Sequence, residues 1–362
     1  MMNKLVIAST VRAGVAVALA GATINGSPAQ PLNNADKSQD YVFRAVSRIE
    51  FVNDRLWILH DDGLLVSLKT DQPTSEAIGT QGKVLDICRS GSRLIAIVAS
   101  GDGRWRVSRR TPRGWDVLAS VAPKNDRAAV LGCSPDARTI TVVTNRRLIE
   151  LGGGRLQTVS LSQTLEPSLA LGTVSVNGDS VWIGFNIGEW GGGLKRISRR
   201  HGTVETIEKK NRPALCAGPL NLSCDPVTGI VQSPSNSKCI IASIGLLHMS
   251  SHGRIIEVCG SKVRQLYSKS LETNLPATAD TDDHFNTTAF FGVARSAGTV
   301  WAVGNDGVYR FEGAEPTFTK LPAFEERAGY RISFAIPGLI LLTTDINQRR
   351  SLSGAVPIMT TR

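Results

Sequence analysis

Residues 181–183 read Val181-Trp182-Ile183, and a short apolar core of this kind recurs along the whole chain. The seven cores are centred on Trp57, Ile95, Ile140, Trp182, Ile240, Trp301 and Ile340. Their centres are 38, 45, 42, 58, 61 and 39 residues apart. Four of these spacings lie near the period of about 40–50 residues that is typical of four-stranded propeller blades. The two longer spacings indicate the same unit carrying insertions.

The residues around the cores favour antiparallel hairpins. Turn-forming residues such as Asn53-Asp54 and Asn177-Gly178-Asp179 precede most cores, and another apolar strand, such as Val84-Leu85-Asp86-Ile87, precedes the turn. This strand–turn–strand order is typical of hairpins. No window keeps apolar residues at helical spacing, so we expect almost no helix. The sequence therefore predicts an all-β fold, a seven-bladed β-propeller.

The two ends of the repeat region favour a closed ring over an open array. The last unit, residues 330–359, offers about three strands, and residues 41–46 form an apolar strand without a partner of their own. We expect this N-terminal strand to complete the last blade and close the ring, because closure removes exposed sheet edges.

Two units resemble the two-component-regulator type of propeller repeat, which has an apolar-Trp-Ile-Gly strand, a short loop, Gly-Leu and a second apolar strand. They are Val181-Trp182-Ile183-Gly184 with Gly193-Leu194-Lys195-Arg196-Ile197, and Val300-Trp301-Ala302-Val303-Gly304 with Gly307-Val308-Tyr309-Arg310-Phe311. Residues 56–65 match more loosely. The resemblance implies a bacterial exported propeller. The family's sensory role is not carried over, because this chain shows no membrane helix or kinase domain behind the propeller.

The first 22 residues are typical of a secretory signal peptide. Lys4 and Arg12 precede the apolar stretch of residues 13–20, and Ala-x-Ala cleavage sites end at Ala20 and Ala22. The alternative is an uncleaved anchor, which would place Arg12 in the membrane at considerable cost. We expect a signal peptide over 1–22, a flexible segment over 23–40 and a single propeller domain over 41–362, located in the periplasm or secreted, with no membrane span after cleavage.

The charge of the chain bears on its partners. The net charge is +10, and it becomes +8 when the two cations of residues 1–22 are removed. A basic exported protein can favour anionic cell-wall polymers, acidic glycans or lipid headgroups, whereas nucleic acid is not expected in that compartment. The alternative is that the charge only aids solubility.

The six cysteines fit an exported protein, because disulfides persist in oxidising compartments. We expect disulfides among the last four, Cys216, Cys224, Cys239 and Cys259, with Cys216–Cys224 as the most local pair. Cys88 and Cys133 each lie seven residues before a strand core, so they occupy equivalent positions in adjacent blades. A bond between them requires Cα atoms within about 7 Å.

Three long loops indicate where a ligand binds. Residues 185–193 join the second and third strands of blade four, residues 211–229 join blades four and five, and residues 268–288 join blades five and six. Strand order sends all three to one face, and loops on rigid scaffolds often carry function. Insertions without a role are the alternative.

Within these loops we single out six candidate ligand-binding residues. Trp190 offers a stacking surface, Glu189 a hydrogen-bonding carboxylate, and the adjacent glycines an approachable backbone. The alternative for Trp190 is a plug folded onto its own blade. The full candidate set is Asn186, Glu189, Trp190, Asn221, Asp225 and Asp282.

Other clusters of polar residues give weaker indications. The run from Asp280 to Asn286 has oxygen ligands suited to calcium, with solvated acids as the alternative. The five histidines are scattered, and we predict no metal site. In blade two, alternation puts Arg104 and Arg106 on one strand face and Trp105 on the other, which suits either an anionic polymer or a solvated surface.

The common catalytic and nucleotide-binding motifs do not occur in the sequence. We therefore expect a non-catalytic binding or sensing propeller without a cofactor, a monomer that takes a small molecule, a glycan or an envelope protein. The alternatives are a cell-envelope enzyme acting on a glycan or related polymer, and a structural component of an envelope assembly.

Overall fold

The computed structural model describes residues 46–69, 76–77, 80, 82–134, 138–165, 172–210, 218–248, 250–272, 286–313, 315–321, 330–344 and 358–361. Within these ranges the chain consists of antiparallel strands, and the short 3-10 helix η2 (Gly188–Trp190) is the one helical element. The all-β prediction is confirmed. No helix in the described part is long and apolar enough to cross a membrane.

The strands form sheets in chain order, each an antiparallel meander. Blade one contains β1 (Val46–Val52), β2 (Arg55–His60), β3 (Leu65–Lys69) and β4 (Glu76–Ala77). Blade two contains β5 (Gly82–Ser90), β6 (Arg93–Ser100), β7 (Trp105–Thr111) and β8 (Gly114–Val121). Blade three contains β9 (Ala129–Cys133), β10 (Thr139–Thr144), β11 (Arg147–Gly152) and β12 (Arg155–Ser160).

The remaining sheets follow the same pattern. Blade four contains β13 (Thr173–Asn177), β14 (Ser180–Asn186), β15 (Gly192–Ser198) and β16 (Val204–Ile207). Blade five contains β17 (Val227–Gln232), β18 (Cys239–His248), β19 (Ser250–Cys259) and β20 (Lys262–Tyr267). Blade six contains β21 (Phe290–Ser296), β22 (Thr299–Gly304), β23 (Gly307–Phe311) and β24 (Thr317–Lys320). The last sheet contains β25 (Tyr330–Ser333), β26 (Leu339–Thr344) and β27 (Ile358–Thr361).

All seven apolar cores of the sequence lie in the second strand of a sheet, from Trp57 in β2 to Ile340 in β26. The turn before the first core is a tight hairpin turn, with Asn53 at φ 54° and Asp54 at φ 55°. Two successive left-handed residues give the turn type that matches the twist of paired strands, and Asn and Asp tolerate this conformation. The repeat that we predicted from the sequence is therefore the second strand of each blade.

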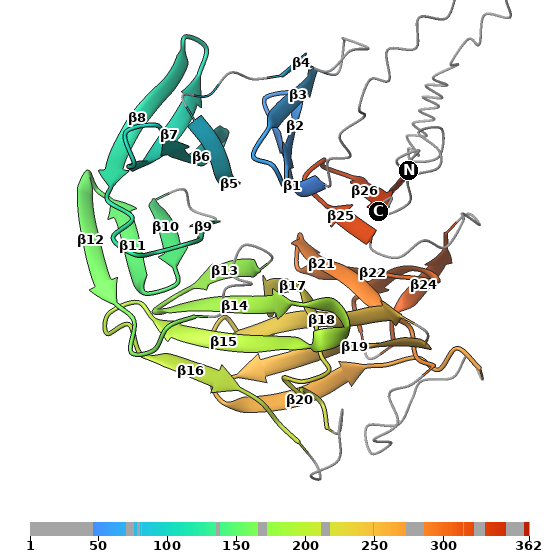
Figure 1. Ribbon diagram of the computed structural model, residues 1–362. Coiled ribbons are helices and arrows are strands. Elements are labelled where there is room, and N and C mark those ends of the chain that lie inside the picture. The colour runs from blue at the N-terminus through green and yellow to red at the C-terminus, as the bar shows by residue number, and fades with distance from the viewer. Residues whose placement is uncertain are drawn as a thin grey trace, which may run out of the picture. The chain divides into compact units, whose positions relative to one another are not determined.

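The first strand of each sheet packs against the first strand of the next sheet, in the order β1, β5, β9, β13, β17, β21 and β25 (Figure 1). The last of them, β25, in turn contacts β1. Successive antiparallel sheets that meet along their first strands define a β-propeller.

The prediction of seven four-stranded blades is wrong. The described residues form six four-stranded blades, and the last sheet has three strands. Pairing of the predicted closing strand, residues 41–46, with the last sheet is not shown by the described residues. Residues 41–45 lie outside the described part, and Val46 begins β1, where it pairs with His60 of β2. The tight turn at Asn53-Asp54 pairs residues 46–52 with the strand that directly follows, and the pairing of residues 41–45 with the last sheet stays a prediction.

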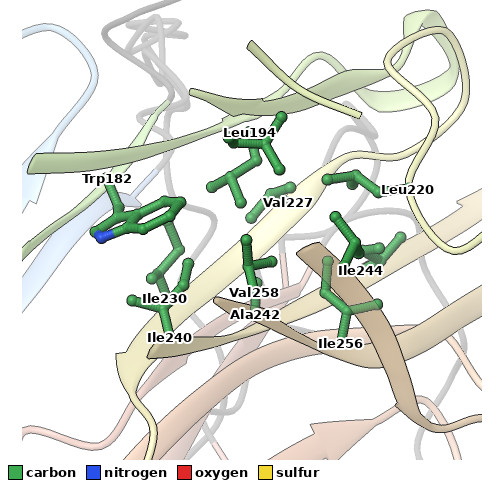
Figure 2. Close-up of a cluster of buried hydrophobic side chains, with 12 residues drawn as sticks. Trp182, Leu194, Leu220, Val227, Ile230, Ile240, Ala242, Ile244, Ile256 and Val258 are labelled. Atoms are coloured by element: carbon green, nitrogen blue, oxygen red, sulfur yellow. The ribbon is translucent and has the colours of Figure 1, made fainter. Parts of the chain in front are cut away.

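Among the described residues, buried apolar side chains form six clusters, one between each pair of consecutive sheets. Figure 2 shows the cluster between blades four and five. Trp182 of β14 and Leu194 of β15 lie on one side of it, and Ile230, Ile240 and other aliphatic residues of blade five on the other. The cores of the sequence are thus the contacts that hold neighbouring blades together.

Trp182→Ala should lower the free energy of unfolding by about 3–5 kcal/mol, because it removes a large side chain that is only 2% exposed. Trp301→Ala should cost less, since Trp301 is only partly buried, with the Arg310 guanidinium 5.5 Å from its ring centroid. Urea denaturation of both variants measures this difference. If both variants lost the same free energy of unfolding, the cluster of Figure 2 would not be a principal interface between blades.

Two disulfide bonds join described cysteines. Cys239 and Cys259 are paired neighbours on β18 and β19, and their Cα atoms are 4.4 Å apart. Cys88 and Cys133 join the first strands of blades two and three, with Cα atoms 5.9 Å apart. The first pair lies among the last four cysteines as predicted, and the second meets the distance condition. Cys224 is also disulfide-bonded, whereas Cys216 lies outside the described residues.

Replacing both Cys88 and Cys133 by Ala should lower the free energy of unfolding by up to about 4 kcal/mol. A bond across 45 residues restricts the unfolded chain over that length. The same change at Cys239 and Cys259, which are 20 residues apart, should cost about 3 kcal/mol. Denaturant titrations of the two double variants give these values. An unchanged unfolding midpoint for the first variant would contradict the expectation.

Candidate functional site

The loop between β14 and β15 presents an exposed indole. Strand β14 ends at Asn186, whose side-chain oxygen accepts a hydrogen bond from the Gly188 amide at 3.1 Å. The helix η2 follows, and Trp190 at its end is 75% exposed. This exposure rules out the alternative in which Trp190 is a plug folded onto its own blade.

The three glycines after Trp190 have positive φ angles, 86° at Gly191, 153° at Gly192 and 80° at Gly193. The Gly192 amide donates to the Leu222 carbonyl at 2.9 Å, and the Gly193 amide donates to the Asp225 carbonyl at 2.8 Å. A Cβ atom on Gly191 would lie 2.2 Å from the Leu222 oxygen. The close approach that we expected between these glycines and a ligand is instead an approach to the next loop of the same protein.

The Glu189 carboxylate lies against the imidazole of His248, a residue that the sequence did not single out. The Glu189 Oε2 and His248 Nδ1 atoms are 2.9 Å apart, and both side chains are about half exposed. His248 ends β18, so the hairpin of blade five meets the loop of blade four at this point. A local sequence pattern could not reveal the pair, because the two residues belong to different blades.

The described parts of the three long loops meet at one end of the blades. Residues 186–193 bond to residues 222–225, as given above. The Thr287 amide donates to the Ser251 carbonyl at 3.1 Å, and the Thr288 amide donates to the Lys269 carbonyl at 2.8 Å. The loops of blades four to six are therefore joined through the β18–β19 hairpin, as strand order requires.

A cavity of about 910 Å³ opens beside this cluster of loops. Its rim includes Asn186, Glu189, Trp190 and His248, and its walls come from the first strands β1, β13, β17, β21 and β25. Ligand pockets typically have volumes of about 300–1,000 Å³. Three of the six predicted ligand-binding residues, Asn186, Glu189 and Trp190, thus line one cavity.

Two other candidates are buried and serve the loop itself, which corrects our prediction for them. Asn221 is 1% exposed and Asp225 is fully buried. The Asn221 amide donates to Asp225 Oδ2 at 2.6 Å, Arg254 forms an ion pair with the same oxygen, and His252 Nε2 lies 3.1 Å from Oδ1. A ligand at the rim cannot reach these atoms. The physical reason is that a connection without strands needs internal partners for its polar groups.

The charges around Asp225 keep it ionised. Burial alone would raise the pKa of its carboxyl group, but the Arg254 charge and the hydrogen bonds from His252 and the Asn221 amide hold the pKa below its usual value. Burial lowers the pKa of Arg254, and Asp225 partly offsets this. Arg254 also donates to the carbonyl oxygens of Pro219 at 2.8 Å and Gly218 at 3.2 Å, which fixes the described part of the loop.

Asp282, the sixth candidate, lies outside the described residues, as does most of the Asp280–Asn286 run considered for calcium. In the described part of the chain, no group of three or more His, Cys, Asp or Glu residues is placed to hold a metal ion. In blade two, Trp105 is buried while Arg104 and Arg106 face solvent, as the strand alternation predicts.

The walls of the cavity include charged groups of β1 and β5. Arg48 forms an ion pair with the buried Asp86 at 3.0 Å. Glu50, two residues along β1, lines the same cavity. Burial raises the pKa of Glu50 to about 7, although the charges of Arg48 and Arg89 oppose this rise. Glu50 therefore exchanges its proton near neutral pH.

No protein-family model matches the chain, and no curated protein matches it. Among solved structures, it is similar to the extracellular domain of a putative hybrid two-component system from B. thetaiotaomicron, with 15% identity and a TM-score of 0.49. That match covers 84% of this chain but 38% of the other, so the chain spans well under half of that protein's length.

Two further structures have the same kind of similarity. The β-propeller domain of the Trilobed protease from Pyrococcus furiosus has 9% identity and a TM-score of 0.49, covering 88% of this chain and 95% of that one. The Dos1 propeller has 15% identity and a TM-score of 0.48, covering 84% and 80%. Similarity at this level carries no functional argument, and the propeller architecture rests on the strand order and packing described above.

Glu50→Gln should stabilise the protein at pH 8 more than at pH 4.5. The folded state holds the Glu50 proton up to a pKa of about 7, whereas the ordinary pKa of this group is 4.5. Between these values the folded state binds more protons than the unfolded state, so wild-type stability falls by up to about 1.4 kcal/mol per pH unit. Urea titrations of the wild type and of Glu50→Gln across this pH range test whether the difference in stability changes in this direction. A pH-independent difference would contradict the expectation.

Proposed function

We propose that this protein is an exported, non-catalytic propeller that binds a ligand at the rim of the central cavity, on the face that carries the long loops of blades four to six. The observation that carries the proposal is the 75% exposed Trp190, placed beside the Glu189–His248 pair at the mouth of a cavity of about 910 Å³. The ligand class is a small molecule or glycan with a planar or sugar ring.

The rim has the parts that such recognition requires. An exposed indole offers a flat apolar face, and a carboxylate beside it accepts hydrogen bonds from hydroxyl groups. The glycine contacts to residues 222–225 hold the loop before any ligand arrives. A loop held in this way loses less conformational entropy on binding, which favours affinity.

The proposed location outside the cytoplasm is supported by the disulfides. The Cys88–Cys133 and Cys239–Cys259 bonds suit an oxidising compartment, the periplasm or the exterior. We propose a monomer that meets its ligand there. An envelope enzyme and a structural component of an envelope assembly are the alternatives, and an indole beside one carboxylate–imidazole pair supports binding over both.

Trp190→Ala should weaken binding of a neutral oligosaccharide at least tenfold, about 1.4 kcal/mol, because the stacking surface is lost. Chitotriose and cellotriose are suitable probes, with affinity measured by titration calorimetry. The melting temperature should stay near that of the wild type, since an exposed side chain contributes little to the core.

The matched control is Leu156→Ala, which removes an apolar side chain that is 46% exposed on the outer strand β12. This variant should bind both sugars as the wild type does. If the wild type binds neither sugar, or if Trp190→Ala and Leu156→Ala bind alike, the rim of the cavity is not a sugar site.

A further inference from the structure

A second concave region lies at blade three, away from the loops of blades four to six. Two adjoining pockets of about 670 and about 500 Å³ form a continuous groove, because they share four lining residues. The shared residues are Asn125, Asp126, Arg146 and Thr164. The groove lies between the connection of blades two and three, the β10–β11 turn and residues 160–165.

Besides Arg147, three cationic side chains of the described residues line this groove: Lys124, Arg127 and Arg146. All three are exposed, and within the described residues their side chains form no hydrogen bond or ion pair. Among the described residues that line the groove, the only acid is Asp126, and it pairs with Arg147, whose Nη2 atom lies 2.5 Å from its carboxylate. The described lining of the groove therefore has an excess of about three positive charges.

Hydrogen bonds from Asn145 and Arg147 hold the floor of the groove. The Asn145 side-chain oxygen accepts from the backbone amides of Arg127 and Ala128 at 3.2 and 3.0 Å, and its amide group donates to the Leu165 carbonyl at 3.2 Å. This one side chain joins all three segments of the groove. Arg147 adds hydrogen bonds to the carbonyl oxygens of Ala122 and Pro123 at 2.8 and 2.9 Å.

The backbone at the edge of the groove is strained. Lys124 has φ 52° and Asn125 has φ 97°, and neither is a glycine. Residues in this region cost about 1–3 kcal/mol each and persist where the surrounding structure holds them, often at binding sites. Here the strained turn brings the Lys124 side chain to the groove.

We propose that this groove binds an oligosaccharide that carries carboxylate or sulfate groups. Guanidinium groups form paired hydrogen bonds with such anions, and three fixed cations along one groove favour several anions in a row over a single ion. The volume is far larger than one inorganic anion needs, and it lies in the range of ligand pockets. The Asn125 and Thr164 side chains can bond to sugar hydroxyl groups.

The groove opens on the same end of the blades as the cavity rim, since inter-blade connections and second-to-third strand turns emerge together. A charged chain held at blade three therefore lies on the face that carries Trp190. The groove itself needs neither Trp190 nor the cavity, so its test is independent of the proposed function.

The test uses a heparin octasaccharide as probe, with the full chain titrated by calorimetry at 0.1 M salt. The triple variant Lys124→Ala, Arg127→Ala, Arg146→Ala should bind at least tenfold more weakly than the wild type. The control variant Arg93→Ala, Arg113→Ala, Arg155→Ala removes three exposed arginines from the strand turns at the other end of the blades. It loses the same net charge and should bind within threefold of the wild type.

Trp190→Ala should also bind heparin as the wild type does, which separates this site from the cavity rim. Equal weakening by the two triple variants would show that only overall charge attracts the polymer, and would overturn the proposal. Absence of wild-type binding at 0.1 M salt would overturn it as well. If millimolar inorganic sulfate displaced the heparin octasaccharide fully, the groove would be a site for a single ion. That result would also contradict the proposal of an oligosaccharide groove.

Discussion

Sheets with apolar side chains on both faces must be covered on both faces, and this constraint organises the whole protein. Strand β6 illustrates it: Ile95 and Ile97 belong to the cluster shared with blade three, whereas Leu94, Ala96 and Val98 belong to the cluster shared with blade one. Alternate residues of a strand point to opposite faces, so one continuous apolar run serves two interfaces. Each inner blade is therefore held by its two neighbours and cannot leave the row without exposing both clusters.

At the first strands of the blades, polar contacts add to the apolar packing between neighbouring blades. The Asp86 carboxylate accepts hydrogen bonds from the Leu131 amide at 2.7 Å and the Ile87 amide at 2.9 Å, and it pairs with Arg48. Arg48 also donates to the Gly172 carbonyl at 3.3 Å. These contacts join the first strands of blades one, two and three to the connection before blade four. A buried carboxylate that accepts several hydrogen bonds and an ion pair avoids much of the cost of leaving a buried polar group unsatisfied.

Features that depend on neighbours in the chain were predictable from the sequence, and features that depend on contacts between blades were not. The seven strand cores and the exposed Trp190 follow from local patterns of turns and apolar residues. Val46, which we assigned to the closing strand, pairs instead with His60 across a tight hairpin. The Glu189–His248 pair joins residues of different blades, and Asp225 looked like a loop acid until its contact with Arg254 was known. Spacing along the chain carries no information about such contacts.

The main role of the buried Asp225–Arg254 pair is to position the loop, and its contribution to the stability of the fold is secondary. Removing two charges from water is costly, and apolar residues of similar volume often stabilise a protein equally well. Within the described residues, Arg254 Nη1 has no hydrogen-bond partner, so the arrangement is not optimised for stability alone. What the pair does achieve is to hold the carbonyl groups of residues 218–219 and the turn at Asn221, against which Gly191 and Gly193 pack. The position of Trp190 at the cavity rim therefore depends on a charged network in the neighbouring blade, which a purely apolar core could not orient in the same way.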